Sequence, residues 1–268
     1  LRGFLEGPEP PPAESHVRGA IAPHIELSLG REVYGDVYRR LRASPPPGRV
    51  VILGTSHLGL EHGFALTRKP YGTPLGTLET DAAYLERILA DDADRLLADE
   101  SRHRTEHTVE FQAVLLRGIW PERPPRIVPV LCGFGHGELH GERRRAIDRF
   151  AARLAEEAGD GVPTMFLASV DLAHLGPRYG DARGPAAEER EQLRRHEARL
   201  TTRLAARDAD GFAAAIAATG DGTRVCGFPA LYTLLRAMRE GAPEPAGYGQ
   251  ADMGEDGSVV SFCGMLFR

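Results

Sequence analysis

A short apolar segment that leads directly to a histidine is the feature that most constrains the fold of this chain. Residues 50–53 are Val-Val-Ile-Leu, and Gly-Thr-Ser-His follows at once and ends at His57. An uninterrupted run of β-branched and aliphatic residues is typical of a strand that is buried on both faces of a parallel sheet. Because ligands of open α/β sheets bind beyond the carboxyl ends of the strands, His57 is a candidate functional residue.

Two other segments have the same arrangement. Apolar residues 19–22 lead to His24, and residues 165–167 lead to His174. A single histidine after a strand is more often a structural residue that makes a hydrogen bond. Three histidines with the same placement favour a shared pocket, because parallel neighbouring strands end at one edge of the sheet. We therefore expect His24, His57 and His174 to line one pocket.

The rest of the chain alternates between strand and helix patterns. We predict further strands at residues 127–131 and 164–169, and helices at residues 32–43, 81–97, 105–116, 144–157, 187–206, 210–218 and 229–239. Glycines and prolines interrupt residues 58–80, which we expect to be an irregular loop. Residues 247–253 and 258–267 are typical of a hairpin. The order predicts an α/β fold with a mostly parallel central sheet, flanking helices and a C-terminal antiparallel hairpin.

Domain organisation follows from where proline is concentrated. Residues 1–17 contain Pro8 and three consecutive prolines at positions 10–12, which indicate an extended N-terminal arm. Low-complexity sequence does not interrupt residues 18–268, and this length can bury a substantial core. We therefore expect residues 18–268 to form a single α/β domain.

Composition argues against several classes of protein. A net charge of −5 over 268 residues gives no reason to expect nucleic acid or an anionic membrane surface as a partner. No apolar run approaches the ~18 residues that a membrane-spanning helix needs. The chain has three cysteines, Cys132, Cys226 and Cys263, and no two of them form a C-x-x-C pair. We therefore expect no disulfide framework and a reduced, cytoplasmic protein. The chain starts at Leu1, which leaves open whether a leader precedes it.

Metal binding is the chemistry that the candidate residues favour. His24 and His57 offer neutral imidazoles, which suit iron, zinc or copper. Cys226 precedes the predicted helix at residues 229–239, and a thiol near a helix N-terminus has a lowered pKa. It can therefore serve as a thiolate ligand or as a nucleophile. The alternative is that Cys226 is a small buried apolar residue.

Two pairs of polar residues accompany these three. Asp171 lies three residues before His174, so the aspartate can orient a histidine or bind a metal, and the histidine can act as a general base. Asp171 can equally cap a helical turn. His107 and Glu110 lie three residues apart on one face of a predicted helix. We expect this pair to support the metal site from behind, although an exposed ion pair explains the spacing as well.

These residues together show that the chain resembles the Memo family, also called AmmeMemoRadiSam system protein B, whose fold is similar to that of class III extradiol dioxygenases. The matching stretches are AIAPH at 20–24, ILGTSH at 52–57, TPLG at 73–76 with Asp81, EHTVE at 106–110, VPVL at 128–131, SVDLAH at 169–174 and CG at 226–227. They run in family order from about residue 18 to the C-terminus.

The resemblance implies a metal-binding pocket formed by His24, His57 and Cys226. Asp171 and His174 would lie beside it as the catalytic residues. In the related dioxygenases, two histidines and a carboxylate hold ferrous iron and a further histidine acts as a base. We therefore expect one metal ion, with iron or copper favoured over zinc.

The chain departs from the family pattern next to the expected ligands. Ile25 and Glu26 follow the first histidine, where the family usually has Ala-Gly. Glu26 is therefore a candidate for a further ligand or for a supporting residue that changes which substrate fits. Val170 replaces the serine that usually precedes Asp171, which removes one hydroxyl from the site.

Three functions are compatible with this pattern. The first is a non-haem metal-dependent oxidoreductase that takes O2 or a small organic molecule at an open coordination position. The second is a non-catalytic protein that binds a metal, or a peptide or protein partner, on the dioxygenase fold. The third is a metal-assisted hydrolase in which zinc lowers the pKa of water and His174 moves protons. A fold alone does not determine the reaction, so the fold does not choose among the three functions. We place the first slightly ahead of the other two.

Overall fold

The computed structural model describes residues 3, 5–8 and 10–268 of the chain. The strands are β1 (Gly19–Ala22), β2 (Arg49–Thr55), β3 (Phe64–Leu66), β4 (Tyr71–Thr73), β5 (Gly76–Leu78), β6 (Arg126–Cys132), β7 (Thr164–Ser169), β8 (His174–Leu175), β9 (Pro243–Asp252) and β10 (Val259–Phe267). The α-helices are α1 (Arg31–Arg42), α2 (Ala82–Leu89), α3 (Ala93–Leu96), α4 (His107–Ile119), α5 (Gly141–Glu157), α6 (Ala187–Ala205), α7 (Ala209–Ala217) and α8 (Phe228–Ala237). Among these described residues, no helix has both the length and the apolar character needed to cross a membrane.

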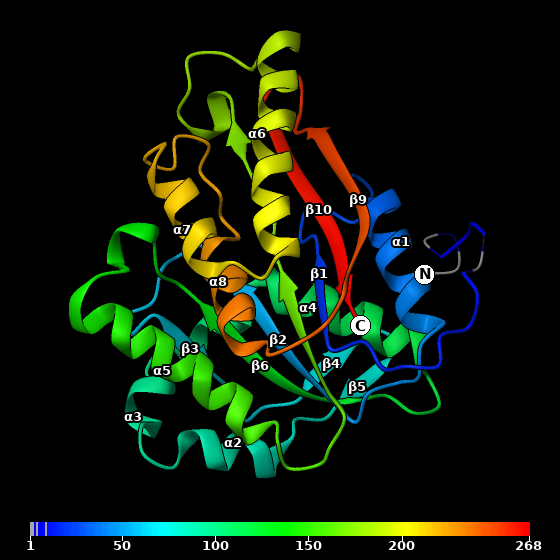
Figure 1. Ribbon diagram of the computed structural model, residues 1–268. Coiled ribbons are helices and arrows are strands. Elements are labelled where there is room, and N and C mark those ends of the chain that lie inside the picture. Colours follow the sequence, from blue (N-terminus) through cyan, green and yellow to red (C-terminus); the bar gives the residue numbers. More distant parts are fainter. Residues whose placement is uncertain (1–2, 4, 9) are drawn as a thin grey trace.

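The central sheet is parallel in its middle and antiparallel at its margins. Strands β6, β2, β7 and β1 lie in that order and run parallel to one another. Strand β3 pairs antiparallel with β6 at one margin, and β10 pairs antiparallel with β1 at the other. Strand β10 also pairs antiparallel with β9 along most of its length (Figure 1). The predicted α/β fold, with its parallel centre and C-terminal antiparallel hairpin, is confirmed.

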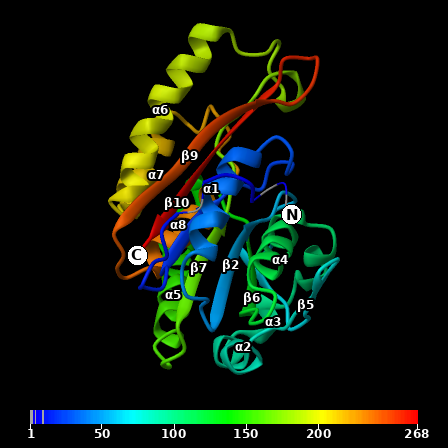
Figure 2. The ribbon, with the colours of Figure 1, turned by 90° about the vertical axis from the view of Figure 1, so that its right-hand side faces the viewer.

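Helices cover both faces of the parallel strands, as Figure 2 shows. Val50 and Ile52 of β2 pack on the face covered by α1 and α4, whereas Val51 and Leu53 pack on the face covered by α5 and α8. All four side chains are completely buried. Each contributes about 1.5–3 kcal/mol to folding by leaving water. Burial on two faces explains why the sequence of β2 is continuously apolar instead of alternating.

Gly54, near the end of β2, is where helix α4 comes closest to the sheet. A Cβ atom at this position would lie 2.5 Å from Oγ1 of Thr108. The Thr108 hydroxyl donates a hydrogen bond to the carbonyl oxygen of Thr55 at 3.0 Å. The missing side chain therefore lets the first turn of α4, with Glu106 and His107, lie against the end of β2.

Two predictions between residues 58 and 97 are wrong. Residues 58–80, expected to be an irregular loop, contain β3, β4 and β5. Strand β3 is held by pairing with the distant strand β6, which a local sequence pattern does not reveal. Strands β4 and β5 pair with each other, although the glycines and the proline around them favour a loop by local sequence. The single helix expected at residues 81–97 is two helices, α2 and α3, because the chain turns after Leu89. Two aspartates stand at this turn, and aspartate favours turns and caps over helix interiors.

The residues before β1 lie partly outside the described part of the chain. The arm predicted at residues 1–17 includes positions 1, 2, 4 and 9, which the structure does not describe. Elsewhere in the arm, the N–H group of Ala13 donates a hydrogen bond to the carbonyl oxygen of Ala43 at 2.8 Å. The Arg39 side chain donates one to the carbonyl oxygen of Glu6 at 3.0 Å. These contacts hold the described part of the arm against α1.

Candidate metal centre

The candidate residues come together at the carboxyl ends of the parallel strands. His24 follows β1, His57 follows β2 and Asp171 follows β7, so parallel pairing brings all three to one edge of the sheet. Cys226 precedes α8, and Gly227 allows its close approach, since a Cβ atom at Gly227 would lie 2.6 Å from the carbonyl oxygen of Asp171. The fold therefore supplies these side chains from four separate segments.

An inner group consists of His24, Asp171 and Cys226. Nδ1 of His24 lies 2.9 Å from the carbonyl oxygen of Ser169, which can only accept, so this nitrogen carries the proton and donates. Nε2 of His24 is left with its lone pair and lies 3.3 Å from Sγ of Cys226. The tautomer is thus fixed by the main chain, and the free nitrogen faces the thiol.

Asp171 fixes the backbone around His24. Its Oδ1 atom accepts hydrogen bonds from the N–H groups of His24 and Ile25 at 3.1 and 3.2 Å. Its Oδ2 atom lies 3.6 Å from Nε2 of His24. Burial raises the pKa of Asp171 to about 7, although the two N–H groups oppose this shift. Burial, and then the neighbouring His57, hold the pKa of His24 well below its ordinary value.

An outer group consists of His57, Glu106 and His107. The carboxylate of Glu106 lies 3.1 Å from Nδ1 of His57 and accepts a hydrogen bond from the His57 backbone N–H at 3.0 Å. The same oxygen, Oε1, lies 3.2 Å from Nδ1 of His107. The two imidazole rings are stacked, with centroids 5.2 Å apart and planes 8° apart. One buried carboxylate therefore holds the His57 ring by a hydrogen bond and lies beside the His107 ring.

The pKa shifts in the outer group follow from this contact. The hydrogen bond with Glu106 raises the pKa of His57. Burial alone would raise the pKa of Glu106, but the hydrogen bonds from His57 outweigh it and the pKa of Glu106 is lowered. Burial lowers the pKa of His107, against the attraction of Glu106. Glu106 is therefore a charged acceptor for the His57 ring, and its charge also acts on the neighbouring His107.

The inner and outer groups meet at His57, and the donor atoms fit a transition metal. The ligand atoms of His24, His57 and Cys226 all lie within 4.8 Å of one another. Ligand atoms of a tetrahedral zinc-type site lie about 3.5 Å apart, from bond lengths of ~2.0–2.3 Å. The 3.3 Å between Sγ of Cys226 and Nε2 of His24 already has this size. Because Glu106 holds the Nδ1 edge of His57, the ring is free to coordinate through Nε2.

The thiol pKa of Cys226 is raised, whereas the sequence predicts a lowered one. The sequence predicts a lowered thiol pKa because a helix follows, but burial, and then the neighbouring Asp171, raise the pKa of Cys226 well above its ordinary value. Helix α8 starts two residues later, at Phe228, and its N-terminal dipole does not compensate. The thiol is therefore protonated in the metal-free protein, and a bound cation would have to displace that proton.

His174 lies near the cluster but faces other partners. Its Nδ1 atom is 3.1 Å from the carbonyl oxygen of Leu172 and 3.2 Å from that of Arg224, so Nδ1 donates and Nε2 is left to accept. Its ring packs edge-to-face on Tyr179, with centroids 4.9 Å apart. Burial lowers the pKa of His174, and His57 contributes to this shift. His174 is therefore a neutral imidazole beside the candidate ligands.

Glu110 and Glu26 lie away from the donor atoms. Glu110 is exposed and lines a cavity of about 270 Å³ together with Tyr71 and His103. Glu26 is also exposed, and its Oε1 atom accepts a hydrogen bond from the Ser28 hydroxyl at 2.5 Å. The supporting role that the sequence suggested for Glu110 is filled by Glu106. The sequence feature that indicates Glu106 is its position directly before His107, at the start of the predicted helix.

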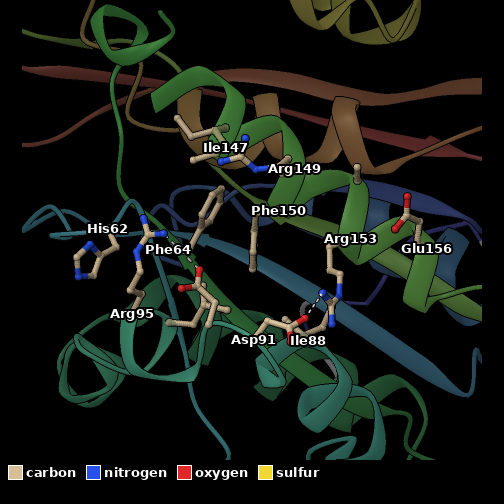
Figure 3. A pocket seen from close by; sticks show the side chains of 14 residues that line it. His62, Phe64, Ile88, Asp91, Arg95, Ile147, Arg149, Phe150, Arg153 and Glu156 are labelled. Atoms are coloured by element: carbon tan, nitrogen blue, oxygen red, sulfur yellow. Dashed lines mark hydrogen bonds and ion pairs between the residues drawn. The ribbon is translucent and has the colours of Figure 1, made fainter. Parts of the chain in front are cut away.

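Two cavities adjoin the cluster, and a third lies elsewhere. His57 lines both a cavity of about 380 Å³, shared with Cys226 and His136, and one of about 280 Å³, shared with His107. A cavity of about 410 Å³ lies between α5 and the α2–α3 segment and is drawn in Figure 3. Its arginines are paired with carboxylates, for example Arg153 with Asp91 at 3.2 Å. Of the candidate metal ligands, His57 lines the first two of these cavities and Cys226 lines the first, and the third contains none of them.

The chain is similar to several known proteins. A sequence profile of the family described as Memo-like protein matches residues 1–266. A MEMO1 family protein of Thermus thermophilus is 30% identical over 242 residues, which cover 89% of this chain and 69% of that protein. A MEMO1 family protein of Aquifex aeolicus is 27% identical over 196 residues, which cover 72% of this chain and 50% of that protein.

A third relative and a solved structure agree with these matches. A MEMO1 family protein of Methanosarcina mazei is 30% identical over 161 residues, covering 60% of this chain and 55% of that protein. This chain thus spans about half the length of the Aquifex and Methanosarcina relatives. The crystal structure of an uncharacterized protein from Escherichia coli K12 superposes with a TM-score of 0.54 at 13% identity. The match covers 94% of this chain and 100% of that one, and it concerns the fold alone.

Proposed function

The chain belongs to the Memo-like protein family, and from this premise we propose that it binds one transition-metal ion through His24, His57 and Cys226 and acts as an oxidoreductase. The observation that carries the proposal is the donor set, two imidazoles and one thiol within 4.8 Å of one another. Thiolate and imidazole ligands suit iron or copper. Such an ion would supply redox chemistry towards O2 or a small organic substrate.

The residues beside the donor set are suited to hold protons. His174 presents Nε2 as an acceptor because carbonyl oxygens occupy its Nδ1 atom. Asp171, whose pKa burial raises to about 7, exchanges a proton near neutral pH. The cavity of about 380 Å³ next to His57 and Cys226 gives a small substrate access to this side of the cluster. These features favour an enzyme over a purely structural metal site.

A second candidate is a non-catalytic protein that binds a metal, or a peptide or protein partner. The observation in its favour is the thiol of Cys226, which stands where the related dioxygenases are expected to have a carboxylate. A thiolate selects softer ions and leaves less preference for ferrous iron. In this case Asp171 and His174 would keep the ligands in place and transfer no proton.

The test is metal analysis of protein purified without oxygen, followed by O2 consumption with catechol-like substrates. We expect the wild-type protein to retain iron or copper and to consume O2. The His174→Phe variant should keep its metal and lose O2 consumption, and His140→Asn, altered at an exposed histidine that lines neither cavity beside the cluster, should keep both.

Two outcomes would separate the candidates. Bound metal without O2 consumption, across catechols and other small phenols, would favour the non-catalytic protein. Wild-type protein that binds neither iron nor copper, while remaining folded by circular dichroism, would overturn the oxidoreductase and leave only the peptide-binding or protein-binding form of the second candidate.

A further inference from the structure

His57 belongs to two groups of potential metal ligands. In the first group its neighbours are His24 and Cys226, and in the second they are Glu106 and His107. In each group the ligand atoms lie within 4.8 Å of one another. The Nδ1 edge of His57 faces Glu106, which leaves the opposite nitrogen for the first group. The two groups therefore use different nitrogens of one ring.

The distances in the second group match a coordination shell. Oε1 of Glu106 lies 3.1 Å from Nδ1 of His57 and 3.2 Å from Nδ1 of His107. Around a tetrahedral ion with bond lengths of ~2.0–2.1 Å, neighbouring ligand atoms lie about 3.3 Å apart. The nearly parallel rings bring both Nδ1 atoms to the same oxygen. Little movement is needed for the three atoms to surround one cation.

The second group also opens to solvent on one side. The side chains of His57 and His107 are 37% and 44% exposed, whereas that of Glu106 is 8% exposed. All three line the cavity of about 280 Å³, which has room for water molecules as further ligands. Arg102 lines the same cavity, and its Nε atom lies 4.0 Å from Oδ1 of Asp99. The buried carboxylate of Glu106 thus lies at the base of the cavity, and the guanidinium group of Arg102 lies at its wall.

We propose that the protein has a second metal site, formed by His57, Glu106 and His107, for a borderline divalent cation such as Zn²⁺ or Fe²⁺. Two imidazoles and a carboxylate are harder donors than the set with Cys226, so the two sites differ in metal preference. The inference rests on the proposed function, because His57 is shared. When both sites are filled, His57 bridges the two ions.

Protons leave when the second ion binds. His107 keeps one proton by moving it from Nδ1 to Nε2. His57, coordinated through both nitrogens, loses its ring proton to solvent. Glu106, already ionised, changes from a hydrogen-bond acceptor to a ligand.

Titration of the metal-free full chain with Co²⁺, without oxygen, tests this arrangement. Cobalt bound to Cys226 gives a near-ultraviolet band from charge transfer between thiolate and metal, whereas cobalt in the second site gives only visible ligand-field bands. We expect two equivalents to bind, one with the thiolate band and one without it. The His107→Asn variant should keep the thiolate band and bind one equivalent.

Matched variants distinguish the possible outcomes. Cys226→Ser should lose the thiolate band and keep the second phase, and His140→Asn, altered at an exposed histidine outside both cavities, should behave as the wild type. His107→Phe serves as a second variant if His107→Asn is unstable. Saturation at one equivalent with a thiolate band, or two equivalents in folded His107→Asn, would overturn the second site. A wild-type titration without any thiolate band would instead overturn the proposed function.

Discussion

The inner and outer groups of the cluster are held in place by different kinds of contact. His24 and Asp171, in the inner group, have side chains that are only 2% and 3% exposed, and main-chain atoms of the sheet edge fix them. His57 and His107, in the outer group, are 37% and 44% exposed and depend on the one carboxylate of Glu106. Strand register therefore positions the inner group, whereas a single side chain positions the outer group.

This difference predicts how each group responds to substitution. A backbone carbonyl such as that of Ser169 cannot be removed by a side-chain change, so the orientation of His24 should be robust. Removing the carboxylate of Glu106 frees the His57 ring and takes away the charge beside His107. The inner group should then tolerate changes around it and lose metal binding only when a ligand itself is replaced, while metal binding by the outer group should be sensitive to its support.

The largest effect is expected for a ligand of the inner group. Replacing Cys226 with Ser should weaken the binding of copper(I) more than about 100-fold, because a hydroxyl is a poor ligand for soft ions. Loss of a ligand should cost more affinity than loss of a residue that only supports a ligand, which costs about 10–100-fold. Competition against a chelator of known affinity measures the change. Cys132→Ala, in the buried end of β6, is the matched control and should bind copper as the wild type does. Equal affinities of Cys226→Ser and wild type would remove the thiol from the site.

A smaller effect is expected for the support of the outer group. Glu106→Gln should weaken metal binding by roughly 10–100-fold, because the amide holds the Nδ1 proton of His57 less well than the carboxylate does and removes the negative charge beside His107. The same competition assay measures it. Glu110→Gln, three residues into α4 and exposed, should leave the affinity unchanged. If Glu110→Gln had the larger effect, the assignment of Glu106 as the support would be wrong.

The two groups should also titrate in opposite directions in the metal-free protein. NMR of the imidazole protons should show the pKa of His57 above 6.5, because of its hydrogen bond with Glu106, and that of His24 below 6.5, because of burial. His24 therefore binds protons more weakly when folded than when unfolded, so its contribution to stability is lost as pH falls below 6.5. The contribution of His57 has the opposite sign and is lost as pH rises through its folded pKa.

The Glu106→Gln variant sharpens this titration experiment. Without the carboxylate, the pKa of His57 should fall towards or below 6.5, while that of His24 should keep its low value. A parallel shift of both histidines would show that the two groups are not independently held.

Much of the fold and part of the site could be predicted from local sequence. The continuous apolar run of residues 50–53 indicates a strand buried on two faces, and histidines after such strands indicate the functional edge of the sheet. Both inferences depend only on neighbouring residues. Strand β3 could not be predicted, since its stability comes from pairing with β6, which is distant in sequence. Strands β4 and β5 pair with each other across a short turn, but the glycines and the proline in this segment favour a loop by local sequence.

The role of Glu106 was missed for a related reason. Its partner His57 lies 49 residues away, and the contact exists because Gly54 lets α4 approach β2. Helical spacing instead indicates Glu110, which lies one turn further along the same face of α4 and lines a different cavity. The pKa of Cys226 was misjudged because the sequence shows that a helix follows but does not show how deeply the thiol is buried.

The smallest effect is expected for Glu26, whose position in sequence suggested a ligand. It lies two residues after His24, yet it is exposed and its carboxylate accepts a hydrogen bond from Ser28 on the same turn. Surface charges are screened by water and salt over about 8–10 Å, so Glu26→Gln should change metal affinity by less than about 2-fold at physiological ionic strength. The competition assay at two salt concentrations measures this, with Glu106→Gln as the positive control. A loss as large as that of Glu106→Gln, unchanged by salt, would mean that Glu26 turns inward when metal binds. The inner group would then depend on a side chain as the outer group does, and the contrast between the two would no longer hold.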